Sequence, residues 1–144
     1  MNTGSYIEEI LLHLGDLKIC FEEDNGKILT VNVIESPAFK YYAGEKINLE
    51  QFENKGDIFQ SNHERADKVF DAIKNGSEKN FQICTDENNR ILDGYLTSAA
   101  MVKLHGTDRK VKVKRFYFEN LNDSTIVRYG EKSYGKSQTH KRFF

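Results

Sequence analysis

The spacing of apolar residues along the chain predicts a mixture of helices and strands. Apolar residues recur three and four positions apart, as on one face of a helix, in residues 5–15, 62–75 and 95–105. Ser5 and Ser61 open the first two segments with the Ser-x-x-Glu spacing of a capping box. Apolar and polar residues alternate, as in strands, in residues 19–21, 27–34, 81–85 and 111–118. The order helix, hairpin, helix, strand pair, helix, strand predicts an α+β domain in which helices flank a mixed sheet.

Turn-forming residues separate these segments. Asp24-Asn25-Gly26 predicts the tight turn of a hairpin. Pro37 predicts the end of regular pairing, and an irregular aromatic-rich segment follows, with a short helix near Leu49–Asn54. A short strand is predicted at Thr125–Tyr129, ahead of a basic tail. We therefore expect a single domain over residues 1–144, with a basic C-terminal segment from about residue 119.

The composition is that of one soluble globular domain. The chain has 144 residues, of which 38% are hydrophobic and 30% charged. It contains no apolar run long enough to span a membrane, and its first residues lack the pattern of a secretory signal. Cys20 and Cys84 match no zinc or redox spacing, and the four histidines are scattered. We expect a cytoplasmic protein with two buried free thiols, no metal site and no membrane partner.

The net charge of −1 conceals an asymmetry along the chain. Residues 109–144 carry ten Lys or Arg against three acidic residues, a net of +7, which leaves −8 on residues 1–108. Segregated charge is typical of proteins with a polyanion surface, although the two halves could also pair with each other in the fold. Lys110, Lys112 and Lys114 alternate and should project from one strand face, so we predict that they bind DNA or RNA together with Arg115. The alternative is an edge strand that lysines protect from aggregation.

The dipeptide Asp93-Gly94 before the third helix has two interpretations. Gly94 would allow an anion to approach the unsatisfied amides at the start of that helix. Asp93 could instead cap the helix, in which case the turn needs no ligand.

The pattern around this turn resembles the ParB/sulfiredoxin-like superfamily. Members often carry two hydrophobic residues, Asp, Gly, His or Tyr, one residue, Arg, two residues and Ala. Here Ile91-Leu92-Asp93-Gly94-Tyr95 and Ala100 are in step with that motif. The helix 62–75 matches the one that usually precedes the motif, and Lys110–Lys114 takes the place of the closing strand. The resemblance covers roughly residues 30–118 and implies the ParB-like fold and a phosphate-binding turn.

The sequence departs from the family at residues that carry its chemistry. Thr97 stands where the family's phosphate-binding arginine would be, and threonine supplies neither charge nor a bidentate fork. Arg90 or Lys103 could compensate for the missing arginine. Sulfiredoxin chemistry needs a cysteine in the turn itself, whereas Cys84 precedes it. The arginine-rich box of ParB proteins is also absent. The resemblance therefore implies a degenerate member.

Three functions remain open at this point. The first is a ParB-like nucleic-acid-associated or nucleotide-binding module with a degenerate catalytic turn. The second is a nucleotide-dependent hydrolase or kinase of the same fold, in which Asp93 does acid/base or metal work and the cofactor is a nucleoside di- or triphosphate with Mg²⁺. The third is a protein-binding accessory factor that uses the aromatic segment around Tyr41. In the first two, the nucleotide site would be lined by Arg90, Gly94, Tyr95 and Thr97.

Overall fold

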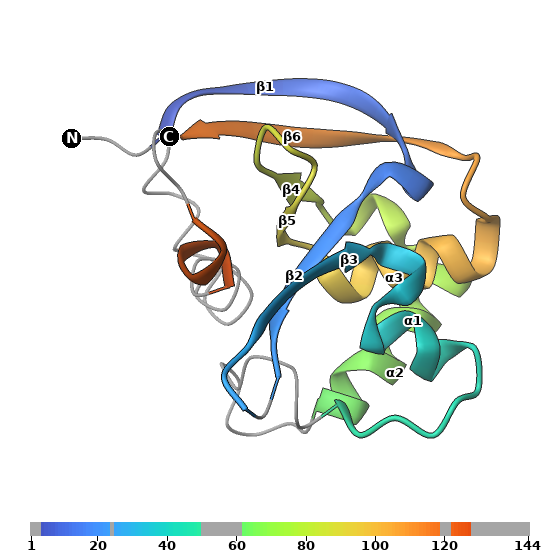
Figure 1. The fold of residues 1–144 in the computed structure, drawn as a ribbon. Coiled ribbons are helices and arrows are strands. Elements are labelled where there is room, and N and C mark those ends of the chain that lie inside the picture. The colour runs from blue at the N-terminus through green and yellow to red at the C-terminus, as the bar shows by residue number, and fades with distance from the viewer. Residues whose placement is uncertain (1–3, 24, 50–61, 119–121, 128–144) are drawn as a thin grey trace.

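The protein is a mixed α+β domain in which a four-stranded sheet packs against helices. The structure, a computed structural model, describes residues 4–23, 25–49, 62–118 and 122–127. Figure 1 shows strands β1 and β6 along one border of the molecule, with helix α3 between the sheet and the other two labelled helices. The α+β class and the mixed sheet that the sequence predicts are confirmed.

The main sheet has the strand order β1-β6-β4-β5. Its strands are β1 (Gly4–His13), β6 (Lys110–Phe118), β4 (Cys84–Thr85) and β5 (Ile91–Asp93). β6 pairs antiparallel with β1 along most of its length and parallel with β4 over two residues, while β5 pairs antiparallel with β4. The long strand β6 is therefore an interior strand, flanked on one side by only a short neighbour.

A hairpin forms a second, two-stranded sheet. Its strands β2 (Lys18–Glu22) and β3 (Ile28–Asn32) pair antiparallel, as the turn signal around Gly26 predicts. Ile19 and Phe21 are buried on the inner face of β2 and alternate with more exposed neighbours. The hairpin thereby closes one side of the core.

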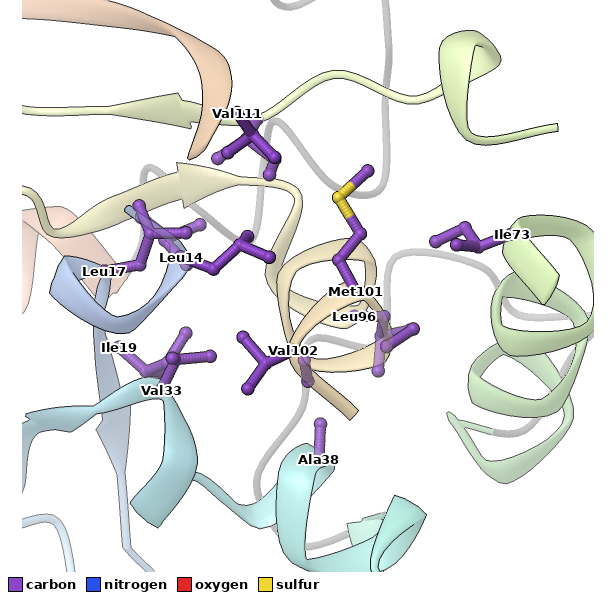
Figure 2. Packing of buried hydrophobic residues seen from close by; sticks show 14 of the residues in the cluster. Leu14, Leu17, Ile19, Val33, Ala38, Ile73, Leu96, Met101, Val102 and Val111 are labelled. Carbon is purple, nitrogen blue, oxygen red and sulfur yellow. The ribbon is translucent and has the colours of Figure 1, made fainter. Parts of the chain in front are cut away.

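Three labelled helices complete the domain, and α3 lies at its centre. They are α1 (Pro37–Tyr42), α2 (Asn62–Lys74) and α3 (Tyr95–His105). All side chains from residue 96 to residue 102 are buried, because α3 packs against other elements all round rather than on one face. Figure 2 shows Leu96, Met101 and Val102 of α3 among core residues that come from the sheet, the hairpin and both other helices.

The helix predicted over residues 5–15 is wrong, because Gly4–His13 forms strand β1 and a 3-10 turn, Leu14–Asp16, follows it. The apolar residues of the segment fit both the helical period of about 3.6 residues and the strand period of two. In the strand, Ile10 and Leu12 lie on one face and Leu11 lies on the other. Ile10 and Leu12 pack against the core, whereas the Leu11 side chain is 64% exposed. Pairing with β6 satisfies the backbone of this segment, and the partner strand lies about a hundred residues away, beyond the reach of local pattern.

Two further predictions differ from the structure. Strand pairing ends before Pro37, but the segment predicted to be irregular begins with helix α1, because proline suits the first helical position and the Ser36 hydroxyl accepts a hydrogen bond from the Phe39 N–H. Residues 123–127 form a short helix, not a strand, and Asn122 Oδ1 accepts the Thr125 N–H at its start. The rest of both the predicted helix 49–54 and the predicted strand 125–129 lies outside the described residues, as does the tail.

Candidate functional site

The Asp93-Gly94 turn has a structural explanation in the residues beside it. Gly94 has φ +95°, a conformation that disfavours side chains, and it forms the N-cap of α3. A Cβ atom at this position would lie 2.7 Å from the Gln82 carbonyl oxygen and 3.0 Å from Ile83 Cα. The turn therefore requires glycine for two structural reasons, its positive φ and the close approach of the backbone of residues 82–83, and neither of them involves a ligand.

The side chains predicted to line a phosphate site point into the protein. The Tyr95 hydroxyl accepts a hydrogen bond of 2.9 Å from the Ala38 N–H, and so joins α3 to the start of α1. The Thr97 side chain is only 5% exposed. Both the N–H and the hydroxyl of Ser98 donate to the Gly94 carbonyl. The structure thus brings Gly94, Tyr95 and Thr97 together in one helical turn, but uses each of them in packing.

Asp93 does not cap α3 as the sequence allowed. The N-cap residue is Gly94, and no side-chain hydrogen bond caps the helix. Burial raises the pKa of the Asp93 carboxyl to about 7, and a hydrogen bond with the Gly94 backbone offsets part of that rise. Near neutral pH, Asp93 therefore passes between a neutral and a charged form.

Neither candidate for the missing arginine can serve this turn. Arg90 Nε donates to Asp86 Oδ2 at 2.8 Å, and Arg90 Nη1 donates to Asp123 Oδ1. Two carboxylates therefore already neutralise its guanidinium. Lys103 lies in the last turn of α3, at the end opposite Gly94. At the motif position of the family's arginine, the chain has the buried Thr97.

Two of the three strand lysines, Lys112 and Lys114, line a groove, whereas Lys110 does not. Val111 and Val113 are buried on the core face of β6, so Lys110, Lys112 and Lys114 occupy the opposite face, as the alternation predicts. A hollow of about 440 Å³ lies there, lined by Glu9, Lys79, Asn80, Phe81, Gln82, Lys112, Val113 and Lys114. We call it the lysine groove. Three of its lining side chains are cationic and one is acidic.

The lysine groove exists because β4 is short. The Lys114 N–H donates to the Ile83 carbonyl at 3.0 Å, and β4 pairs only with Lys114 and Arg115. Before Ile83, the chain leaves β6, and residues 79–82 form the other wall of the groove. No strand of the described chain pairs with residues 110–113 on this side. The edge-protection interpretation of the lysines applies only to this short open stretch, because β6 is otherwise an interior strand.

Arg115 belongs to a different surface from the lysines. It lies on the core-side face of β6, in register with Thr85 of β4, and its Nη2 donates to Asn89 Oδ1 at 2.7 Å. The buried Nε of Arg115 and the buried hydroxyl of Thr85 have no hydrogen-bond partner among the described residues. The structure thus brings Lys112 and Lys114 together in the groove and holds Arg115 away from it.

The aromatic residues around Tyr41 connect two helices. The Tyr41 hydroxyl donates to Asp67 Oδ1 at 2.8 Å, and the Tyr42 hydroxyl donates to the Ala66 carbonyl at 2.6 Å. The Tyr41 ring also packs on His63, with centroids 4.9 Å apart. These contacts join α1 to α2, which explains the aromatic cluster without a partner protein.

The two cysteines are free, and their surroundings keep both thiols protonated. Burial raises the pKa of the Cys84 thiol to about 12, and burial likewise raises the pKa of Cys20, whose Sγ lies 2.9 Å from the Thr30 hydroxyl. A thiol that stays protonated is a poor nucleophile, so neither residue has the character of a catalytic cysteine.

Sequence reasoning found the lysines of β6 but missed the other wall of the groove. Phe81 begins the segment predicted as a strand, but β4 covers only Cys84–Thr85, and Lys79 lies in the 3-10 turn Glu78–Asn80. The hydrogen bond from the Lys114 N–H to the Ile83 carbonyl brings this connection beside β6. No local signal in the sequence indicates this proximity.

No family model, curated protein or solved structure matches the chain. Within the described part of the chain, every helix is too short or too polar to cross a bilayer.

Proposed function

We propose that this protein is a nucleic-acid-associated module and that the lysine groove receives the phosphate backbone of the bound strand. The observation that carries the proposal is the convergence of Lys79, Lys112 and Lys114 on one hollow, against Glu9 as the single acidic residue of the lining. Phosphate groups bound beside these ammonium groups would release condensed counterions, which is the main source of affinity for nucleic-acid backbones.

The Asp93-Gly94 turn supports this site instead of acting as a catalytic turn. Gly94 packs directly on the backbone of residues 82 and 83, and Ile83 in turn accepts the Lys114 N–H. The turn therefore holds one wall of the groove at a fixed place beside β6. The ParB-like pattern of the sequence favours the same class of partner, with the enzymatic residues of that turn lost.

The test is charge reversal of two groove lysines. The double variant Lys112→Glu, Lys114→Glu should bind labelled DNA or RNA oligonucleotides at least tenfold more weakly, measured by fluorescence anisotropy. The slope of log K against log salt should also become shallower by about one to two, since each lost phosphate contact removes roughly 0.7 to 0.9 from it.

A matched control separates local contacts from net charge. Lys46, which follows α1, and Lys68 of α2 are exposed and do not line the groove, so Lys46→Glu with Lys68→Glu changes the total charge by the same amount. The proposal requires that this control retain most of the affinity. Equal loss in both double variants, or no loss in either, would contradict it.

A further inference from the structure

We infer that the lysine groove selects single-stranded nucleic acid and that Phe81 stacks on an unpaired base. The inference rests on the proposed function, because it assumes that the lysines bind phosphates. The inference specifies single-stranded over double-stranded nucleic acid, a distinction that cationic side chains alone do not make.

The lining of the groove contains more than charges. Asn80, Phe81 and Gln82 follow Lys79 along one wall, and the lysines of β6 line the same hollow. A surface that binds only backbone needs cations, whereas an aromatic ring with carboxamides beside it is the set of groups that bind unpaired bases. The ring can stack on a base face, and the amides can hydrogen-bond to base edges. Groups suited to phosphates and groups suited to bases thus line one hollow.

Phe81 is held in place for this role. Its side chain is half-buried, and it both packs at the margin of the core and contributes to the groove. Two residues later, Ile83 is buried and accepts the Lys114 N–H, while Gly94 packs against its backbone. A ring that is fixed before binding loses little conformational entropy when a base stacks on it.

A duplex cannot use this arrangement. Bases inside a double helix have both faces covered by their neighbours, so presenting one to Phe81 would require unstacking at a cost of a few kcal/mol. A single strand offers its base faces freely, and its backbone can follow the lysines while a base turns toward Phe81. The position of Glu9 on the β1 side of Lys114 repels phosphate there and favours a path along the side of Lys79.

The experiment compares a single strand with the duplex of the same sequence by fluorescence anisotropy at one fixed salt concentration. The wild-type protein should bind the single strand at least tenfold more tightly. Phe81→Leu, which keeps an apolar side chain at the core margin, should weaken single-strand binding by about five- to a hundredfold, the range of one base–aromatic stack. Its duplex affinity and its salt slope should not change.

Two further variants make the result specific. Phe81→Tyr keeps the ring and should retain the single-strand preference. If Phe81 had only a structural role, the folded Phe81→Leu and Phe81→Tyr variants would bind the single strand equally well. Phe39→Leu alters another half-buried phenylalanine at the margin of the same core, outside the groove, and should have no effect on binding. Circular dichroism of each variant verifies that it is folded.

The outcomes distinguish this inference from the proposed function. If the lysine reversal abolishes binding but Phe81→Leu changes nothing, or if duplex binds as tightly as single strand, the inference is wrong and the proposed function stands. If the lysine reversal leaves binding unchanged, the proposed function itself fails. Displacement of the single strand by poly-glutamate at equal charge concentration would also overturn the inference, because it would show that the groove recognises charge without bases.

Discussion

Gly94 is the residue on which the geometry of the groove wall depends most directly. Its positive φ and its contact with the backbone of residues 82–83 are separate requirements for glycine. Gly76 also has a positive φ, +96°, yet a Cβ atom there would meet nothing within 4 Å. Substitution at Gly76 therefore tests the backbone conformation alone, and substitution at Gly94 tests the conformation together with the close contact.

We expect Gly94→Ala to destabilise the protein more than Gly76→Ala does. The conformational cost is about 1 kcal/mol at each site, and the clash at residue 94 adds roughly 1–3 kcal/mol more. Urea unfolding of both variants measures the difference. Equal losses of stability would mean that residues 82–83 move away freely, and that the turn does not position the groove wall.

Asp93 gives the stability of the protein a pH dependence of definite sign. The folded-state pKa of its carboxyl is raised to about 7 from an ordinary 3.8, so between these values the folded state holds a proton that the unfolded state has lost. The Asp93 contribution to the free energy of unfolding therefore falls as pH rises from about 4 to 7, by up to 1.4 kcal/mol per pH unit.

We expect Asp93→Asn to remove this contribution, since asparagine cannot ionise. The variant should gain stability relative to the wild type as pH increases from 4.5 to 7.5, with the difference levelling off above pH 7. Urea unfolding of both proteins at four pH values measures it, and other titrating groups cancel in the comparison. Parallel curves would show that Asp93 is solvated in the folded state.

At the scale of elements, the helices α2 and α3 could be predicted closely from the sequence because their signals are local. The apolar stripe of α2 and the glycines that follow both helices specify their limits within a residue or two. β1 could not be predicted, because its apolar spacing fits both periods and only the distant strand β6 decides between them. For the same reason, only one wall of the groove could be predicted. Its lysines follow a strand pattern, whereas residues 79–82 lie beside them only through tertiary contact.

The start of α3 carries a prediction about nucleotides. Gly94 is packed against residues 82–83, Thr97 is buried, and two carboxylates already hold Arg90. We therefore expect ATP, CTP, GTP and ADP at millimolar concentration with Mg²⁺ to leave the thermal unfolding temperature unchanged. A ligand at 100 times its dissociation constant would add about 2.7 kcal/mol, which is a shift of several degrees.

The wild-type protein is the right one for this measurement. Because Thr97 is buried, restoring the family's arginine at that position would disrupt the core and could not report on a phosphate site. A clear shift with one nucleotide would contradict the degenerate turn and support the enzymatic alternative.

At the scale of the whole molecule, the pairing of β1 with β6 brings the two charged halves of the sequence together. Glu8 and Glu9 of the acidic half lie opposite Arg115 and Lys114 of the basic half. Acidic and basic side chains of the two halves thus lie at neighbouring positions on adjacent strands, where opposite charges attract. The groove combines three cations, Lys79, Lys112 and Lys114, with the carboxylate of Glu9, so a polyanion there meets a net charge of +2.

That same pairing sets the order in which the chain can fold during synthesis. Leu12 leaves the ribosome about a hundred residues before Val111, its partner in the sheet, so at 5–20 residues per second β1 waits roughly 5 to 20 seconds for β6. Contacts of such long range slow folding, and an unpaired apolar strand is prone to aggregate in the interval. Because the apolar spacing of this segment also fits a helix, a transient helix would satisfy its backbone hydrogen bonds until β6 is synthesised.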